Sequence, residues 1–375
     1  MNRRARIWHR AIQLLLACVG ALVATAAHAG GTCSYTPDNP YGNNPAVLVA
    51  PLNVNALTVG RDVPNGTVLY RQTVRPMSPR VTCSNVGTIA TITKNFKLPT
   101  TPLPLANWNG SPYPGHVYQT GVPGIGIALW YAGNPFPWTT TSDNCGGLTV
   151  SCNWTIETAQ FDISVIKIGP VSPGVIQASN FPTVQIDWVT DNTLTVQRTS
   201  FTGSINIVAQ TCTTPDVNVD MGAHQTRAFT GAGSATPWRD FSIQLQNCPA
   251  FYRSYAYVQN NDSATGWSSS VATNPNVLGF TLAPSTPIIN PAQGIVGLSP
   301  AMSGPATATG VGLQVATASN VPVSFNTVMS SGITPTATSG ASYSIPLRAR
   351  YIQTGSSAPT PGPANTSIMF TINYQ

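Results

Sequence analysis

The feature that most constrains the fold is an alternation of large apolar and mostly polar side chains at the end of the chain. At residues 368–375, the large apolar side chains Ile368, Phe370, Ile372 and Tyr374 alternate with Met369, Thr371, Asn373 and Gln375. A period of two places all four on one face of a β-strand, because successive side chains of a strand point to opposite faces. No turn follows, so we expect no later strand of the chain to pair with this one.

The amino-terminal residues have the pattern of a secretory signal peptide. Four arginines within residues 3–10 precede an apolar stretch at residues 12–23, and Ala27-His28-Ala29 matches a cleavage site. We predict that residues 1–29 are removed on export. The apolar stretch is too short to span a membrane as a helix.

Charged residues make up only 7% of the chain, against about 25% in an average soluble protein. Four of the 17 basic residues lie in the signal, so the mature chain has 13 basic and 11 acidic residues, a net charge of +2. This small net charge predicts no nucleic-acid partner. The abundance of Gly, Pro, Thr, Ser and Asn is typical of an exported β-protein with many turns.

Six of the seven cysteines follow the signal, and an even number in an exported chain predicts disulfides. Six cysteines allow several connectivities, but the spacing favours sequential pairing. The favoured pairs are Cys33–Cys83, Cys145–Cys152 and Cys212–Cys248. Zinc is the alternative, but the sequence has no C-x-x-C pair and only His116 and His224 follow the signal. We therefore expect neither a metal nor a cofactor.

Short alternating segments separated by Gly, Pro, Asn and Asp recur along the chain, without any lasting helical period. They are residues 67–70, 126–131, 161–168, 183–188, 194–197, 204–208, 241–245, 311–315 and 344–351. This pattern predicts an all-β protein built from β-sandwiches or barrels. The length is sufficient for two domains, which we place at residues 30–205 and 206–375.

The carboxy-terminal half resembles the pilin domain of chaperone–usher fimbriae. Residues 240–249 (DFSIQLQNCP), 309–314 (TGVGLQ) and 346–355 (PLRARYIQTG) are similar to pilin strands in the right order, with Cys212 at the place of the first pilin cysteine. Gly362 and the alternating tail complete the order. The resemblance implies an immunoglobulin-like sandwich that lacks its last strand, and whose groove is bordered by Gly362, Ile368, Phe370, Ile372 and Tyr374.

The same resemblance implies partners and a place in the fibre. A periplasmic chaperone, and later an adjacent pilus subunit, would fill the groove with a strand, and an outer-membrane usher would assemble the subunits. Only residues 30–32 separate the predicted cleavage site from Cys33, so we expect no segment for donation to another subunit. With a whole domain in front of the pilin-like one, this arrangement is typical of a tip adhesin, exposed at the cell surface.

The amino-terminal domain is then the expected receptor-binding module. Residues 57–70, 121–127 and 164–170 resemble segments of tip-adhesin domains, which implies an elongated jelly-roll-like sandwich. Sugars are bound by aromatic faces beside Asn, Asp and Gln, and two segments combine these types. The candidate ligand-binding residues are Trp108, Tyr113, Tyr118, Trp138, Asp143 and Asn144. The alternative for each aromatic residue is a place in the core.

Catalytic patterns are weak. Ser164 and Lys167 fit S-x-x-K, but the companion motifs of the serine acylases are absent or in the wrong order. Asp143, Asp162 and Asp187 share a domain, without a spacing typical of a glycosidase. We predict that the chain is no enzyme, and that it is a tip adhesin for a host glycan. The alternatives are a structural tip or adaptor subunit that binds protein or surfaces, and a secreted carbohydrate-active enzyme.

Overall fold

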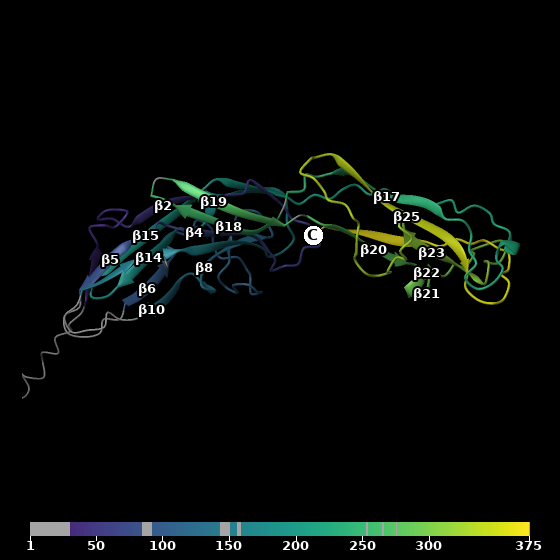
Figure 1. The fold of residues 1–375 in the computed structure, drawn as a ribbon, viewed down its shortest axis with the longest axis horizontal. Helices are drawn as coiled ribbons and strands as arrows, with labels where there is room; N and C mark the ends of the chain where they lie inside the picture. The colour runs from purple at the N-terminus through teal and green to yellow at the C-terminus, as the bar shows by residue number, and fades with distance from the viewer. Residues whose placement is uncertain are drawn as a thin grey trace, which may run out of the picture.

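The computed structural model describes residues 31–84, 92–142, 151–155, 159–252, 254–264, 266–274 and 276–374. The predicted signal peptide, Asp143, Asn144 and Cys145 lie outside these residues. Within them the chain forms two β-sheet lobes in an elongated molecule, with the carboxy terminus between the lobes (Figure 1). No helix in the described part is long and apolar enough to cross a membrane.

The first lobe holds the strands that precede residue 209. They are β1 (Thr32–Tyr35), β2 (Ala46–Pro51), β3 (Ala56–Thr58), β4 (Val68–Arg75), β5 (Arg80–Ser84), β6 (Ile92–Lys97), β7 (Tyr118–Gln119), β8 (Ile125–Tyr131), β9 (Asn134–Pro135), β10 (Trp138–Ser142), β11 (Ser151–Thr155), β12 (Phe161–Lys167), β13 (Gly174–Gln177), β14 (Val184–Val189), β15 (Thr193–Thr202) and β16 (Ser204–Val208), with the 3-10 helix η2 (Ala178–Asn180). Two large sheets have the orders β10-β6-β14-β15-β2 and β19-β18-β4-β12-β8-β7, where β18 is Ser254–Asp262 and β19 is Trp267–Asn274. Strand β9 pairs with β8. Two smaller sheets, β1-β5-β11 and β13-β16-β3, complete the lobe.

The second lobe is a sandwich of two sheets, in the orders β17-β25-β23-β22-β21 and β24-β20-β26. Its strands are β17 (Arg239–Cys248), β20 (Leu278–Pro284), β21 (Ile288–Asn290), β22 (Ile295–Val296), β23 (Val311–Thr317), β24 (Met329–Ser330), β25 (Ala341–Gln353) and β26 (Ile368–Tyr374), with the 3-10 helices η3 (Thr226–Ala228) and η4 (Pro291–Gln293). The two strands between β17 and β20 in the sequence, β18 (Ser254–Asp262) and β19 (Trp267–Asn274), lie in the first lobe instead.

The prediction of an all-β fold is confirmed, and each predicted segment overlaps a strand. The alternation was informative because one face of each strand is buried, as in β2, where buried and exposed side chains alternate. Strand β12 departs from this pattern, since all seven of its side chains are buried. On its second face, Ile166 forms a small apolar cluster with Val117 and Ala128, against which Trp108 packs.

Each lobe has its own hydrophobic core. The first contains large buried side chains such as Phe96, Phe161 and Trp188, and the second contains Phe280, Ile345 and Tyr374. The predicted domain boundary between residues 205 and 206 stays a prediction. The β18–β19 hairpin follows this boundary in the sequence but lies in the first lobe.

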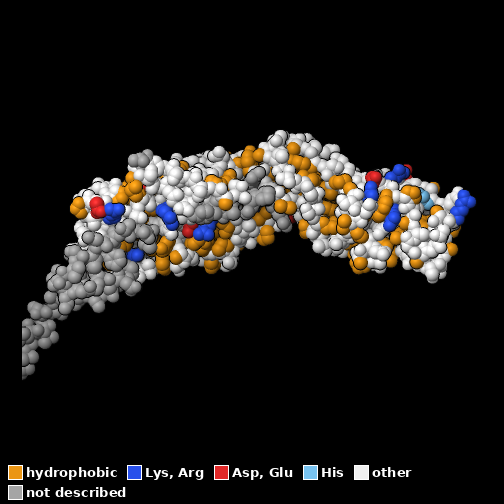
Figure 2. All heavy atoms as spheres, viewed as in Figure 1, with side chains coloured by type: hydrophobic (Ala, Val, Ile, Leu, Met, Phe, Trp, Pro, Cys, Tyr) orange, Lys and Arg blue, Asp and Glu red, His pale blue; other side chains and the backbone are white. Residues whose placement is uncertain are grey.

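Two of the three predicted disulfides are confirmed. Cys33–Cys83 joins β1 to β5, where the two cysteines are register partners, and Cys212–Cys248 lies in the second core. The third pairing, Cys145–Cys152, falls outside the described residues. The surface carries few charges, as the composition predicts, and on the face shown hydrophobic side chains are scattered over both lobes (Figure 2).

Candidate functional site

A groove opens into the core of the second lobe between the edges of its two sheets. Strand β17 ends the order of one sheet and β26 ends the order of the other. The cavity between them has a volume of about 1020 Å³. It is lined by apolar side chains from both sheets, namely Phe241, Ile243, Leu282, Leu313, Val315, Leu347, Ala349, Tyr351, Ile368 and Phe370. Core residues of a β-sandwich are therefore reachable from outside along one side of the lobe.

The wall of the groove formed by β26 combines apolar side chains with an unpaired backbone edge. Among the strands that the structure describes, β26 has a single neighbour, β20, with which it pairs from Leu278↔Tyr374 to Pro284↔Ile368. An edge strand presents N–H and C=O groups that can pair with an additional strand. An extended segment with alternating apolar residues could thus bond to β26 and fill the cavity with its side chains.

The five predicted groove residues divide into three environments. Ile368 and Phe370 line the groove and are only partly buried. Ile372 and Tyr374 lie in the core, each 6% exposed. Gly362 lies in the loop before β26, where a Cβ atom would stand 2.1 Å from the carbonyl oxygen of Ala306. Glycine is required there for close packing of two loops.

Tyr374 connects the groove strand to the junction between the lobes. Its hydroxyl accepts a hydrogen bond from the Cys212 backbone N–H at 3.1 Å, and its ring stacks on Phe251 with 6.0 Å between centroids. Burial raises the pKa of this phenol. Gly60 of the first lobe approaches so closely that a Cβ atom would lie 2.1 Å from the Tyr374 carbonyl oxygen.

The opposite rim of the groove is a segment that sequence reasoning did not single out. Residues 214 and 216–222 line the cavity, and Val217 and Met221 pack against the second core. The alternation of Val217, Val219 and Met221 was the available signal. Asp220 lies on the same rim, and its charge adds to burial in raising the pKa of Tyr351.

In the first lobe, two of the predicted ligand-binding aromatics lie together. Trp108 and Tyr113 both pack against the apolar cluster of Val117, Ala128 and Ile166. Tyr113 stacks on Trp130 with 5.6 Å between centroids, and the Arg71 guanidinium lies 4.4 Å from the Trp130 ring. Burial raises the pKa of Tyr113 to about 12. Arg71 also pairs with Asp162, at 3.2 and 3.3 Å.

The structure does not bring the other two described candidates to this place. Tyr118 is 9% exposed and belongs to the first core. Trp138, on β10 of the other large sheet, stacks on Phe96 at 5.2 Å. Asp143 and Asn144 lie outside the described residues. The sugar-binding role of all six remains a prediction, which now centres on Trp108 and Tyr113.

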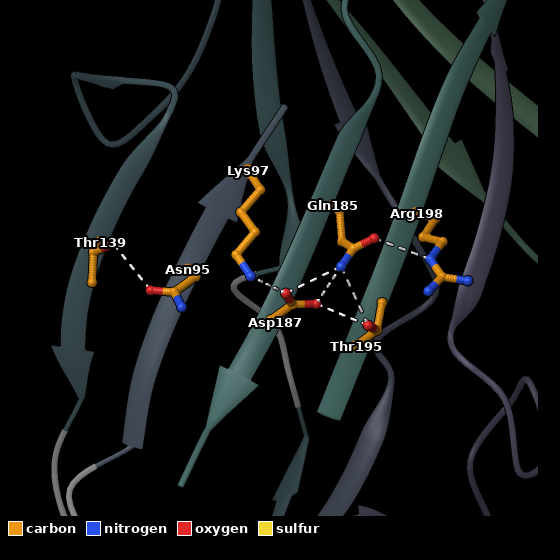
Figure 3. Close-up of polar contacts among 7 residues, drawn as sticks. All are labelled: Asn95, Lys97, Thr139, Gln185, Asp187, Thr195 and Arg198. Carbon is orange, nitrogen blue, oxygen red and sulfur yellow. Dashed lines mark hydrogen bonds and ion pairs between the residues drawn. The ribbon is translucent and has the colours of Figure 1, made fainter. Parts of the chain in front are cut away.

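The outer face of the five-stranded sheet carries a row of polar side chains (Figure 3). The Asp187 carboxylate, whose side chain is 1% exposed, accepts hydrogen bonds from Lys97 at 2.8 Å, Thr195 at 2.9 Å and Gln185 at 2.9 Å. Gln185 in turn accepts from Arg198 at 3.1 Å. These contacts satisfy the buried carboxylate, as a buried charge requires.

The weak catalytic patterns have structural explanations within the described residues. Asp162 and Asp187 lie on different sheets, each paired with a cation, so they do not form the facing pair of a glycosidase. Ser164 accepts a hydrogen bond from the Trp130 indole at 2.9 Å. The Lys167 ammonium donates to backbone carbonyls of the loop at residues 60–63. No group of three His, Cys, Asp or Glu side chains in the described part could hold a metal ion.

The sequence model of the family described as "Fimbrial protein" matches residues 199–375. These residues are thus a fimbrial protein domain, and the predicted resemblance to chaperone–usher fimbrial proteins is confirmed at the level of the family. The groove described above lies within the matched residues. No curated protein sequence matches the chain.

Several solved structures are similar to the chain at low sequence identity. The CupB6 tip adhesin from Pseudomonas aeruginosa is 15% identical, with 92% of this chain and 95% of that chain covered and a TM-score of 0.33. The receptor binding domain of the plasmid-born adhesin MrkD1P of Klebsiella pneumoniae is 22% identical over 49% of this chain and 99% of that chain, with a TM-score of 0.31. The CsuC-CsuE chaperone-tip adhesion subunit complex of Acinetobacter baumannii is 10% identical over 91% and 100%, with a TM-score of 0.23.

Proposed function

We propose that the chain is the tip adhesin of a chaperone–usher pilus. In this proposal the second lobe accepts a strand, first from a periplasmic chaperone and then from the adjacent pilus subunit, during assembly at the outer-membrane usher. The first lobe binds a host glycan at the cell surface. The observation that carries the proposal is an apolar groove beside an edge strand, within a domain that matches the fimbrial family.

The physical argument for a strand as the occupant rests on the two components of the groove. Its floor is apolar, so contact with water is unfavourable and burial by a partner is favourable. Its wall at β26 presents backbone groups that a strand satisfies and a helix does not. A segment with alternating apolar side chains meets both requirements at once.

The assembly mechanism is tested by recovering the chaperone from periplasm with the tagged chain. Replacing Phe370 by Asp places a charge in the groove wall, and we expect recovery of the chaperone to be lost. Met302→Asp, at a fully exposed position away from the groove, is the matched control and should behave as the wild type. Equal recovery with Phe370→Asp and Met302→Asp would refute strand acceptance in this groove.

We assign the adhesive role to the first lobe, most of which precedes the fimbrial match in the sequence. Trp108 and Tyr113 supply aromatic surface, and Arg71, which lies over the Trp130 ring on which Tyr113 stacks, would donate hydrogen bonds to sugar hydroxyls. The test is a glycan array probed with the full mature chain in complex with its chaperone, alongside the Trp108→Ala variant. Selective binding that Trp108→Ala abolishes supports this site.

Two other array results would count against parts of the proposal. Selective binding that Trp108→Ala leaves intact moves the sugar site elsewhere on the first lobe. An empty array with a folded chain favours the second candidate function, a tip or adaptor subunit that contacts protein or a surface. Neither result affects the assembly test, which depends on the second lobe alone.

A further inference from the structure

The hairpin formed by β18 and β19 belongs to the fimbrial match by sequence and to the first lobe by structure. The chain leaves the second core after Phe251 and returns to it at Leu278. Between these residues, β18 lies parallel to β4, from Val258↔Gln72 to Asn261↔Arg75, and β19 pairs with β18 outside it. The seven-stranded sheet of the first lobe thus receives two strands from the second half of the chain (Figure 1).

Apolar side chains of the hairpin are part of the first core. Val258 is fully buried among first-lobe residues. The ring of Tyr255 meets that of Tyr70 edge to face, with 5.8 Å between centroids, and Trp267 packs against the same core. These are the contacts of a structural element of the lobe, whereas two domains that merely touch would meet through surface side chains.

Polar contacts fix the hairpin in register. Asn260 is fully buried, and its amide donates to the Pro51 carbonyl at 2.8 Å and accepts from the Asn53 side chain. At the end of β18, the Tyr41 hydroxyl donates to the Asp262 carboxylate at 2.7 Å. A buried amide is tolerated only when its groups are paired, so this pairing depends on the exact position of β18.

Without the hairpin, the seven-stranded sheet of the first lobe would lose the two strands that lie beside β4. Strand β4 would become the edge of its sheet and expose unpaired backbone groups. Tyr70 and Gln72, both fully buried in the whole chain, lie on that strand. The second half of the chain therefore supplies what the first lobe needs to close its core.

We propose that the β18–β19 hairpin completes the first lobe in cis, so that the receptor-binding unit of this chain is residues 31–208 together with residues 254–274. This goes beyond the proposed function, because it holds whatever the first lobe binds. The chain crosses between the lobes at residues 208–212, 251–254 and 274–278, which joins them by three covalent connections. A pull on the second lobe would be transmitted to the first through all three.

Contacts at the junction add to this coupling. The Thr58 hydroxyl donates to the Ala250 carbonyl at 2.9 Å and accepts from the Tyr252 backbone N–H at 2.8 Å. These bonds hold the base of the hairpin against β3 of the first lobe. These contacts therefore fix the point at which the chain leaves the second lobe against the first lobe.

Hydrogen exchange of the full mature chain, read peptide by peptide, tests the proposal. Val258→Asp places a charge in the first core, and Ser270→Asp adds the same charge at an exposed position of the same hairpin. We expect the peptides of β18 and β4 to exchange at least tenfold faster in Val258→Asp than in Ser270→Asp. The peptides of β25, in the second lobe, should exchange equally in both variants, because local openings follow structural units.

Val258→Thr keeps the shape of the side chain, and its hydrogen exchange tests the proposal if the Val258→Asp variant does not fold. A buried hydroxyl without a partner should speed exchange in β18 and β4 by about tenfold, which corresponds to roughly 1.4 kcal/mol. The proposal is overturned if β4 keeps its wild-type protection while β18 opens, since the first lobe would then be complete without the hairpin. It is also overturned if β25 opens as much as β4.

Discussion

Lys167 holds the loop at residues 60–63 to the end of β12, and its removal gives the sharpest stability prediction. The side chain is 4% exposed, and its ammonium donates to the carbonyls of Gly60 at 3.3 Å, Arg61 at 2.8 Å and Val63. Burial lowers the pKa of this ammonium. The loop it holds includes Gly60, which contacts Tyr374 of the second lobe.

The expected cost of Lys167→Met follows from these three bonds. A hydrogen bond to a charged group contributes ~1.5–3 kcal/mol when buried, but water can reach part of this loop, so we take ~1 kcal/mol for each. The unpaired carbonyls then cost ~3 kcal/mol. Burying a thioether in place of an ammonium recovers ~1 kcal/mol, because the charge no longer has to be desolvated. We expect the first lobe to lose ~2 kcal/mol of unfolding free energy.

Urea unfolding followed by tryptophan fluorescence measures this loss, since Trp130 and Trp188 lie in the first lobe. Arg61→Met is the control, because that side chain is 70% exposed and its loss should cost less than ~0.5 kcal/mol. If Lys167→Met costs no more than Arg61→Met, the bonds seen here do not hold the loop, and the reasoning is wrong.

Three further predictions concern tyrosine ionisation, loop packing and the disulfides. Burial raises the pKa of Tyr113 and of Tyr35 to about 12, above the ~10 of a free phenol. The unfolded state therefore releases these protons at lower pH than the folded state, and the free energy of unfolding should fall between about pH 10 and pH 12. Tyr113→Phe should reduce that fall in an alkaline unfolding series followed by tyrosinate absorbance. Gly362→Ala should lower the thermal midpoint of the second lobe by several degrees, because the added methyl meets the Ala306 carbonyl, whereas Gly355→Ala, with open space around it, should change it little. Replacing both Cys33 and Cys83 by Ser should cost about 2–4 kcal/mol in urea unfolding, because the bond closes a loop with a sequence separation of 50; an unchanged midpoint would contradict the loop-closure argument.

Local alternation made most of the second lobe predictable. Ile368, Phe370, Ile372 and Tyr374 do share one face of β26, and the pilin-like segments at residues 240–249 and 346–355 form the paired strands β17 and β25. A period of two reports one buried face, and that signal lies entirely in neighbouring residues. What alternation does not report is depth: Ile368 and Phe370 line a groove, whereas Ile372 and Tyr374 are in the core.

The hairpin and the ligand site could not be predicted in the same way. In β18 the register shifts between Tyr255 and Tyr257, so the bulge breaks the period of two, and its partner β4 is far away in the sequence. For the aromatic candidates, the sequence gives side-chain type without the neighbouring sheet. Tyr118 and Trp138 have the composition of a sugar site, yet their rings pack in the first core because of the sheets on which they lie.

The open edges of the two lobes differ, and under the proposed function this difference explains why only the second lobe takes a strand from a partner. In the first lobe, the side of β4 is covered by β18, and Val258 and Asn260 are fully buried there. In the second, β26 has no outer neighbour among the described strands, and the apolar side chains of Ile368 and Phe370 face a cavity of about 1020 Å³. Filling the cavity in cis would leave no edge for another chain to join. In the proposed function, the second lobe keeps this edge available for a strand from its neighbour, whereas the first lobe, proposed to bind the receptor, has a core closed by its own chain.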